Sequence, residues 1–204
     1  AFNITIPRNK LVDYPNIENS PFANNYVIGM PINISKWIKY NGVDPQTGIY
    51  QLAGTSIPKD QTEIYDLSQR SYGGLQNTLN YKSLTLDFFF QFVNKMGKTA
   101  ISFSAPGTRT NQPVEVLDRW QKPGDISEYQ KFSQTGAPLT TYSFYANSSE
   151  ARITDASFLR LKNVSLSYKF NSKIAHKLRA ETIRLYVQAQ NLFTVTPYKL
   201  GDPE

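Results

Sequence analysis

The stretch from Ala151 to Pro203, ARITDASFLRLKNVSLSYKFNSKIAHKLRAETIRLYVQAQNLFTVTPYKLGDP, has the pattern of one long β-hairpin. Two alternating segments are separated by a polar turn from Asn171 to Thr182. In the second segment the odd positions carry apolar residues: Ile183, Leu185, Val187, Ala189, Phe193 and Val195. The even positions carry polar residues or tyrosine: Arg184, Tyr186, Gln188, Gln190 and Thr194. A period of two held this long predicts a sheet with one apolar face and one polar face.

The first segment of this hairpin changes parity midway. Leu159 and Leu161 are at odd positions, whereas Val164, Leu166 and the aromatic residues after them are at even positions. This slip predicts a β-bulge at Lys162–Asn163, where one extra residue shifts the alternation.

A second hairpin is predicted between Leu75 and Phe92, with Lys82-Ser83 as its turn. A two-residue turn places Tyr81 opposite Leu84, so the apolar series on either side of the turn share one face. Two further strands are predicted, at Phe2–Ile6 and at Tyr26–Tyr40, joined by a polar connection at Arg8–Asn24. Two long loops are predicted at Asn41–Tyr72 and at Asn94–Ala156, and the second of them contains a predicted helical turn at Val114–Trp120.

The composition excludes several classes of protein. The net charge of +6 comes from scattered basic residues, so no basic stripe indicates nucleic-acid binding. With no cysteine the chain has neither disulfides nor thiolate metal sites. No run of roughly 18 apolar residues predicts a membrane helix. Both ends look cut, which indicates a segment of a longer protein.

The predicted strands number about six, and short turns alternate with long loops, as in outer-membrane barrels. The polar faces carry mainly uncharged residues, which suits a barrel lumen, and the apolar faces suit lipid. A soluble β-sandwich or soluble barrel remains the alternative, although such folds expose charged faces and have short loops at both ends.

Several motifs resemble the SusC/RagA family of TonB-dependent outer-membrane transporters. The motifs, in family order, are NYVIGMPINI (25–34), GVDPQTGIYQ (42–51), YGGLQNTLNYKSLTLDFFFQF (72–92), LDRWQKPGD (117–125), DASFLRLKNVSLSYKF (155–170) and IRLYVQAQNLFTVTPYKLGDPE (183–204). The resemblance implies an all-β, antiparallel transmembrane barrel of about 22 strands with a plugged lumen. Residues 1–204 would be the C-terminal part of this barrel, without the plug domain and the final strand.

The resemblance also implies the setting of the chain. It places the protein in the bacterial outer membrane and makes it an importer of glycans or oligopeptides, energised by the TonB complex and partnered by a SusD-like surface lipoprotein. Arg8–Asn24, Lys82-Ser83 and Asn171–Thr182 would be periplasmic turns, and the two long loops extracellular. The strand motifs do not separate glycan importers from peptide importers.

No catalytic motif, cofactor motif or metal-ligand spacing is present, so an enzyme is not expected. His176 reads as a solvated turn residue, and the scattered loop carboxylates lack the spacing of a calcium loop. The alternative function to transport is a soluble carbohydrate-binding β-module that uses loop aromatics.

Three sets of candidate site residues follow. Loop aromatics can stack on sugars, although packing or contact with the lipoprotein is the simpler role for each: Trp120, Tyr129, Tyr142 and Tyr145. The residues expected to face the lumen, lining the path or hydrogen-bonding the plug, are Asp87, Gln91, Arg184, Gln188 and Gln190. The residues expected to face the lipid bilayer are Phe88, Phe90, Phe92, Ile183, Leu185 and Val187.

Overall fold

The computed structural model describes residues 1–99, 104–199 and 201–204, which form two compact units. The sheet unit contains Ala1–Arg8, Gln69–Lys95 and Asp155–Glu204, and the loop unit contains Asn9–Ser68 and Met96–Thr154. Within the described residues, no helix is both long enough and apolar enough to span a membrane.

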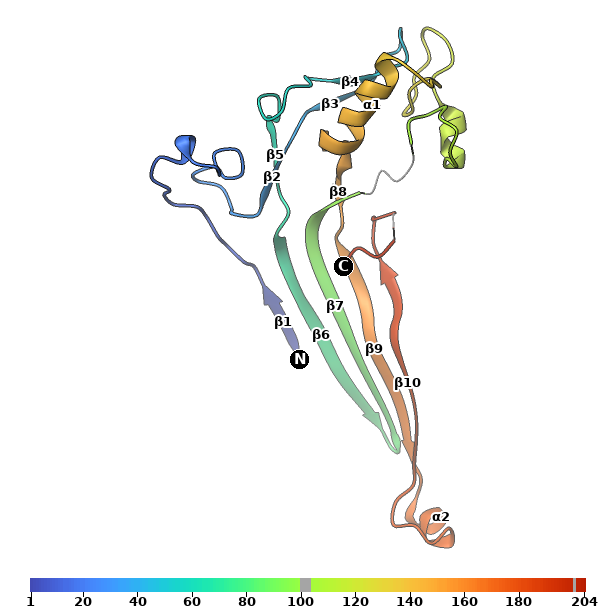
Figure 1. The fold of residues 1–204 in the computed structure, drawn as a ribbon. Coiled ribbons are helices and arrows are strands. Elements are labelled where there is room, and N and C mark those ends of the chain that lie inside the picture. The colour runs from blue at the N-terminus through green and yellow to red at the C-terminus, as the bar shows by residue number, and fades with distance from the viewer. Residues whose placement is uncertain (100–103, 200) are drawn as a thin grey trace. The chain divides into compact units, whose positions relative to one another are not determined.

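The strands of the sheet unit lie in the order β1-β6-β7-β9-β10, and every neighbouring pair in this order is antiparallel (Figure 1). Their bounds are β1 Phe2–Thr5, β6 Gln69–Tyr81, β7 Leu84–Lys98, β9 Phe158–Lys169 and β10 Arg184–Val195. The short strand β8, Ile153–Asp155, pairs with β7 and is the sixth strand. The fold is therefore the predicted antiparallel, all-β one.

Both predicted hairpins are confirmed. Tyr81 pairs with Leu84 across a two-residue turn in which Lys82 has φ of 53°, a left-handed conformation suited to tight hairpins. The turn between β9 and β10 contains helix α2, Ser172–Lys177, whose first turn is capped by the Asn171 side chain accepting from the Ile174 N–H at 3.0 Å.

The β-bulge at Lys162–Asn163 is also confirmed. Asn163 pairs with Phe89 and Leu161 pairs with the next residue, Phe90, so Lys162 is left without a partner on β7. The register against β10 also shifts at this place, but there the extra residue is on β10, which has two residues between Gln190 and Phe193 opposite Lys162 alone.

The loop unit is built from short elements. Its strands are β2 Ile34–Trp37, β3 Tyr40–Val43, β4 Tyr50–Leu52 and β5 Glu63–Asp66, and β2 pairs with β5 and β3 with β4. Its helices are η1 Ile17–Asn19, η2 Val114–Asp118, α1 Ala137–Ser148 and η3 Glu150–Arg152. Tyr50, Ala105 and Tyr142 form its core, against which Tyr40, Val43, Leu139, Tyr145 and Ala146 pack.

Two sequence predictions about the first third of the chain are wrong. Within the predicted strand Tyr26–Tyr40, only Ile34–Trp37 (β2) and Tyr40, the first residue of β3, belong to strands, and both strands pair within the loop unit. Gly29 has φ of 90° and Pro31 cannot donate a ladder hydrogen bond, so the alternation there does not form a strand. The Leu11 N–H donates instead to the Met30 carbonyl at 2.8 Å.

Arg8–Asn24 is consequently not a hairpin turn. Thr5 pairs with Tyr72, so β1 is the direct neighbour of β6, and residues 6–68 form one connection between them. This connection leaves the sheet at the end opposite the Lys82-Ser83 turn, which contradicts the periplasmic position predicted for Arg8–Asn24.

The long predicted loop Asn94–Ala156 contains more structure than its sequence suggested. The helical turn predicted at Val114–Trp120 is confirmed as η2, but the twelve-residue helix α1 was not predicted. Its sequence, APLTTYSFYANS, is rich in residues of modest helix propensity and lacks an apolar stripe, and Pro138 lies at its first turn. Residues 100–103 of this loop lie outside the described part of the structure.

Candidate functional site

The strand register places apolar residues from every long strand on one face of the sheet, called here the apolar face. On β7 the series Leu84, Leu86, Phe88, Phe90 and Phe92 lies opposite Tyr168, Leu166, Val164, Leu161 and Leu159 of β9. Those β9 residues lie in turn opposite Leu185, Val187, Ala189, Phe193 and Val195 of β10. The bulge is what keeps Leu161 and Val164, which differ in parity, on this one face.

Much of the apolar face is open in the described structure. Val187 is 70% exposed and Leu185 is 63% exposed, and Leu79 and Leu166 are about half exposed. Ring pairs line this face: Phe88 and Phe90 lie 5.8 Å apart along β7, and Phe90 of β7 lies 6.1 Å from Phe193 of β10. An exposed apolar surface this continuous needs a partner other than water.

All six residues predicted to face lipid belong to the apolar face by register. Phe88, Phe90, Phe92, Leu185 and Val187 are paired within the sheet, and the Ile183 carbonyl accepts a hydrogen bond from the Phe170 N–H at 3.0 Å. The lipid itself remains a prediction.

The opposite face, called here the polar face, holds all five residues predicted to face the lumen. By register Asp87 and Gln188 both lie opposite Ser165, Gln91 opposite Arg160, Gln190 opposite Asn163, and Arg184 opposite Lys169. Cross-strand side-chain hydrogen bonds join Thr78 to Asp87 at 2.5 Å and Thr85 to Asn80 at 2.8 Å. These two pairs satisfy part of the polar face, whereas the buried Oε1 of Gln91 accepts no hydrogen bond from the described residues.

Three of the four loop aromatics, Trp120, Tyr142 and Tyr145, pack against residues far away in the sequence, and Tyr129 is half-buried. Tyr145 stacks on Tyr50 with ring centroids 4.0 Å apart, and Tyr142 lies 6.2 Å from Tyr50. Trp120 and Tyr142 are each only 8% exposed. Burial raises the pKa of Tyr142 and of Tyr145 to about 12. This placement is that of packing residues, and a contact with substrate remains a prediction.

Trp120 joins two of the motifs found in the sequence. Its indole Nε1–H donates to the Pro45 carbonyl at 2.9 Å, and its ring covers Gly48, where a Cβ would lie 2.3 Å from the ring. The Trp120 N–H donates to the Tyr129 carbonyl, also at 2.9 Å. VDPQTG and WQKPGD are thus two sides of one clasp in the loop unit, for which the linear motifs gave no sign.

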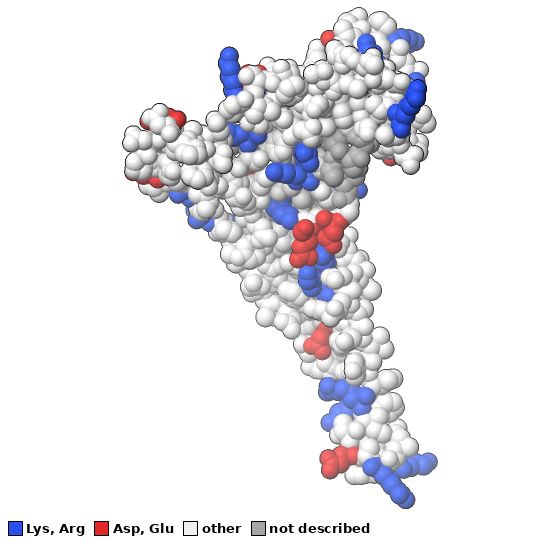
Figure 2. Space-filling view, in the orientation of Figure 1, with Lys and Arg blue, Asp and Glu red and all other residues white. Residues whose placement is uncertain are grey.

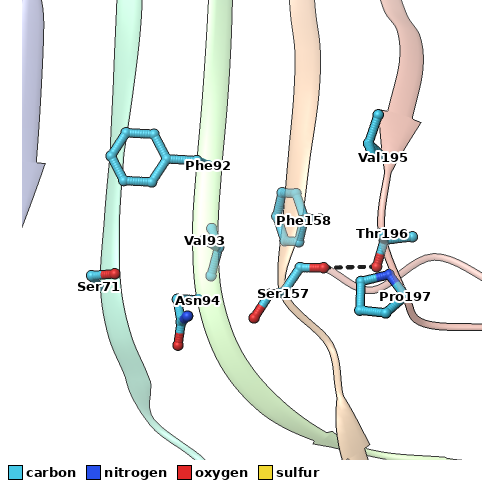
Figure 3. A pocket seen from close by; sticks show the side chains of 9 residues that line it. All are labelled: Ser71, Phe92, Val93, Asn94, Ser157, Phe158, Val195, Thr196 and Pro197. Atoms are coloured by element: carbon cyan, nitrogen blue, oxygen red, sulfur yellow. Dashed lines mark hydrogen bonds between the residues drawn. The ribbon is translucent and has the colours of Figure 1, made fainter.

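A hollow of about 560 Å³ lies in the sheet unit where the strands end. It is lined by residues of β6 and β7 and by residues at or next to the ends of β9 and β10 (Figure 3): Ser71, Phe92, Val93, Asn94, Ser157, Phe158, Val195, Thr196 and Pro197. The Thr196 hydroxyl donates to the Ser157 carbonyl at 2.7 Å across this hollow.

The sequence reasoning missed a charged cluster on the polar face. Arg160, only 4% exposed, forms ion pairs with Asp202 and with Glu204, and Lys162 pairs with Glu204 at 3.2 Å. Figure 2 shows acidic and basic side chains in contact near the C-terminus. Arg160 stands at a polar-face position in the predicted alternation, but its partners are more than 40 residues away.

The described residues contain no group of three or more His, Asp or Glu side chains that could hold a metal ion. His176 lies on α2, in the turn between β9 and β10.

Comparisons with known proteins found relatives among the TonB-dependent receptors. No family model matches the chain. TonB-dependent receptor P3 of Formosa agariphila is 27% identical over all of this chain, which spans 23% of that receptor. TonB-dependent receptor P26 of the same organism is 27% identical over 64% of the chain, which spans 13% of it.

Solved structures share the fold. A structure of the RagAB peptide transporter matches 87% of this chain with a TM-score of 0.71 and 25% identity, over 20% of the transporter chain. The RagAB peptide importer in its closed-closed state matches 94% of the chain with a TM-score of 0.65 and 22% identity, over 22% of its chain. The chain is thus similar in sequence, along its whole length, to a segment of a TonB-dependent receptor, and similar in fold to a segment of the RagAB peptide transporter.

Proposed function

We propose that this chain is part of the wall of a TonB-dependent importer in the bacterial outer membrane. In this proposal the apolar face meets the lipid bilayer and the polar face lines the lumen. The observation that carries the proposal is the register: five adjacent strands present apolar side chains on one face, where Asn77 of β6 is a polar exception. A water-soluble sheet of this size covers such a face with a second layer.

The dimensions of the apolar face fit a bilayer. From Leu84 to Phe92 the series on β7 covers eight residue steps, which at roughly 3.3 Å each is roughly 26 Å along the strand. A tilt of roughly 40° reduces this to roughly 20 Å of height, and the side chains extend it toward the apolar band of roughly 25 Å in outer-membrane barrels. Tyr81 and Tyr168 lie at the turn end of the face, where such barrels carry aromatic girdles.

The substrate and partners belong to the same proposal. The solved relatives are titled a peptide transporter and a peptide importer, which supports import of oligopeptides, while glycans remain the other substrate class that the motifs allow. The similarity to the RagAB transporter also supports a SusD-like surface lipoprotein as partner. The TonB complex would act through parts of the protein outside this chain.

The alternative, a soluble carbohydrate-binding module, needs aromatic rings open to solvent. Trp120 and Tyr142 are buried in the loop unit, and Tyr145 is stacked on Tyr50. The exposed apolar face would also have no partner in such a module.

Uptake by cells that carry the complete protein tests the proposal. We expect the protein to fractionate with the outer membrane, and uptake of a labelled oligopeptide or oligosaccharide to require both the protein and TonB. The two labelled substrates, supplied separately, distinguish the two classes. A complete protein that stays monomeric in water without detergent would contradict the proposal, as would uptake unaffected by deletion of TonB.

A further inference from the structure

Arg160 is the centre of a cluster that the proposed transport function does not explain. Its guanidinium is almost wholly buried, and three different side chains accept its hydrogen bonds. Nε–H donates to the Thr194 hydroxyl at 3.0 Å, one terminal nitrogen donates to Glu204 at 2.6 Å, and the other donates to Asp202. The Phe158 ring lies 5.0 Å from the guanidinium carbon and shields one side of the group.

The two carboxylates come from a segment that folds back onto the sheet after β10. We call this segment, residues 196–199 and 201–204, the strap. At its beginning the Thr196 hydroxyl donates to the Ser157 carbonyl, and the Tyr198 N–H donates to the Thr196 hydroxyl at 3.1 Å. At its other end Pro203 is buried, and the Glu204 N–H donates to Asp202 at 2.9 Å.

The β-bulge contributes a second cation to the same place. Lys162 is the residue without a partner on β7 or β10, and its ammonium lies 3.2 Å from the Glu204 carboxylate. Its side chain is about one-third exposed, whereas that of Arg160 is 5% exposed. Screening by water therefore makes the Lys162 pair the weaker one, and Arg160 the principal contact.

A buried guanidinium needs its partners, because an uncompensated buried charge is strongly destabilising. Asp202 and Glu204 are themselves about half exposed or more, so they lose little hydration when they pair. The Glu204 N–H and the Arg160 guanidinium hold the pKa of Asp202 below its ordinary value. The carboxylate is therefore charged in neutral solution, with Arg160, Lys162 and Glu204 as the charged groups that face it.

We infer that Arg160 anchors an ionic latch that fixes the strap on the polar face of the sheet. Thr196 and Pro197 of the strap also line the hollow at the strand ends. The closed latch thus holds one side of this hollow in place, and an open latch frees it. The inference concerns the sheet unit alone and does not depend on the transport proposal.

Trypsin cleavage of the complete protein after Lys199 measures the open state. Lys199 is exposed and lies between Thr196 and Asp202, the two ends at which the strap is held, so we expect release of the latch to make this bond more accessible and the rate to report the open population. In Arg160→Ala we expect cleavage to become roughly ten times faster or more, because one buried partner of two ion pairs is lost. Arg160→Lys keeps the charge but lacks the planar fork, so its rate should lie between wild type and Arg160→Ala.

Two further variants make the test specific. Asp202→Asn combined with Glu204→Gln removes the carboxylates without changing the sheet and should raise cleavage in the same direction as Arg160→Ala. Lys162→Met should change the rate less than threefold, roughly the effect of a weak exposed pair. Cleavage after Lys177, in the turn beyond the other end of β9, is the internal reference.

The latch is wrong if cleavage after Lys199 is unchanged in both Arg160→Ala and the double carboxylate variant. It is equally wrong if cleavage after Lys177 rises by the same factor, because that result shows general loosening of the sheet. A rise confined to Lys199 supports the latch.

Discussion

Arginine substitutions on β10 should lower the stability of the protein when they lie on the apolar face, and should have much less effect on the polar face. On the apolar face the loss of stability should increase with the depth of the residue in the bilayer. On the apolar face of β10, Leu185, Val187 and Ala189 follow one another along the strand, and each belongs to a different row of residues paired across the strands. Leu185 shares the row of Tyr168 at the turn end of the face, and each later row lies two residues further along the strand.

The expected magnitudes follow from the geometry of the rows. Two residues are roughly 6.6 Å along a strand, which a tilt of roughly 40° converts to roughly 5 Å of depth. Ala189 would then lie roughly 10 Å below the row of Tyr168, close to the middle of an apolar band roughly 25 Å tall. We expect arginine to cost about 0–1 kcal/mol at Leu185, an intermediate amount at Val187 and about 2–4 kcal/mol at Ala189.

The polar face supplies the matched controls. Tyr186→Arg, Gln188→Arg and Gln190→Arg introduce the same side chain one residue away, on the face that the proposal assigns to a water-filled lumen, and should each cost much less than the deep apolar positions. Ala189→Leu controls for size without charge and should be almost neutral. Guanidinium-induced unfolding of the complete protein in lipid vesicles measures the free energies. Costs that are equal on the two faces, or that do not increase from Leu185 to Ala189, would refute the orientation of the sheet.

Three further predictions concern the loop unit. Gly48→Ala should destabilise by about 1–3 kcal/mol more than Gly124→Ala in thermal unfolding, because both glycines have positive φ but only Gly48 is covered by Trp120; equal effects would contradict the clasp. Trp120→Phe should cost about 0.5–1.5 kcal/mol through loss of the hydrogen bond to Pro45, and a loss of uptake without a loss of stability would instead support direct substrate contact. Burial raises the pKa of Tyr142 and Tyr145 to about 12, so their contribution to stability is complete below the ordinary tyrosine pKa and is lost as the pH rises from about 10 to 12. The pKa values of Tyr40, Tyr50 and Tyr65 are raised as well, so tyrosinate absorbance should show a set of late-titrating groups, which loses one member in each of Tyr142→Phe and Tyr145→Phe. Titration of all tyrosines near pH 10 would contradict the packing.

The strands of the sheet unit could be predicted from sequence because turn length and the alternation of apolar and polar residues, which determine the hairpins and the faces, are visible in short stretches of the chain. A two-residue turn fixes the partner of Tyr81, and the parity change after Leu161 fixes the place of the bulge. Period-two alternation then assigns each residue of β7 and β10 to a face, with no knowledge of what lies beyond it.

The loop unit could not be predicted in the same way, because its contacts join distant segments. The alternation from Tyr26 to Tyr40 was a misleading signal, broken at Gly29 and Pro31. Tyr142 is buried by Tyr50, and Trp120 by Gly48, which are 92 and 72 positions away in the chain. The latch partners of Arg160 were hidden for the same reason, since no local pattern relates β9 to residues 202–204.

The most direct test of the account is the environment of consecutive side chains on β10. Spin labels placed one at a time from Arg184 to Gln190, in the complete protein in lipid bilayers, report their accessibility to oxygen and to a water-soluble nickel complex. We expect a period of two, with the odd positions Leu185, Val187 and Ala189 accessible to oxygen from the lipid and the even positions accessible to nickel. Uniform accessibility along the strand, or the opposite alternation, would contradict the claim that the apolar face of this sheet meets the membrane.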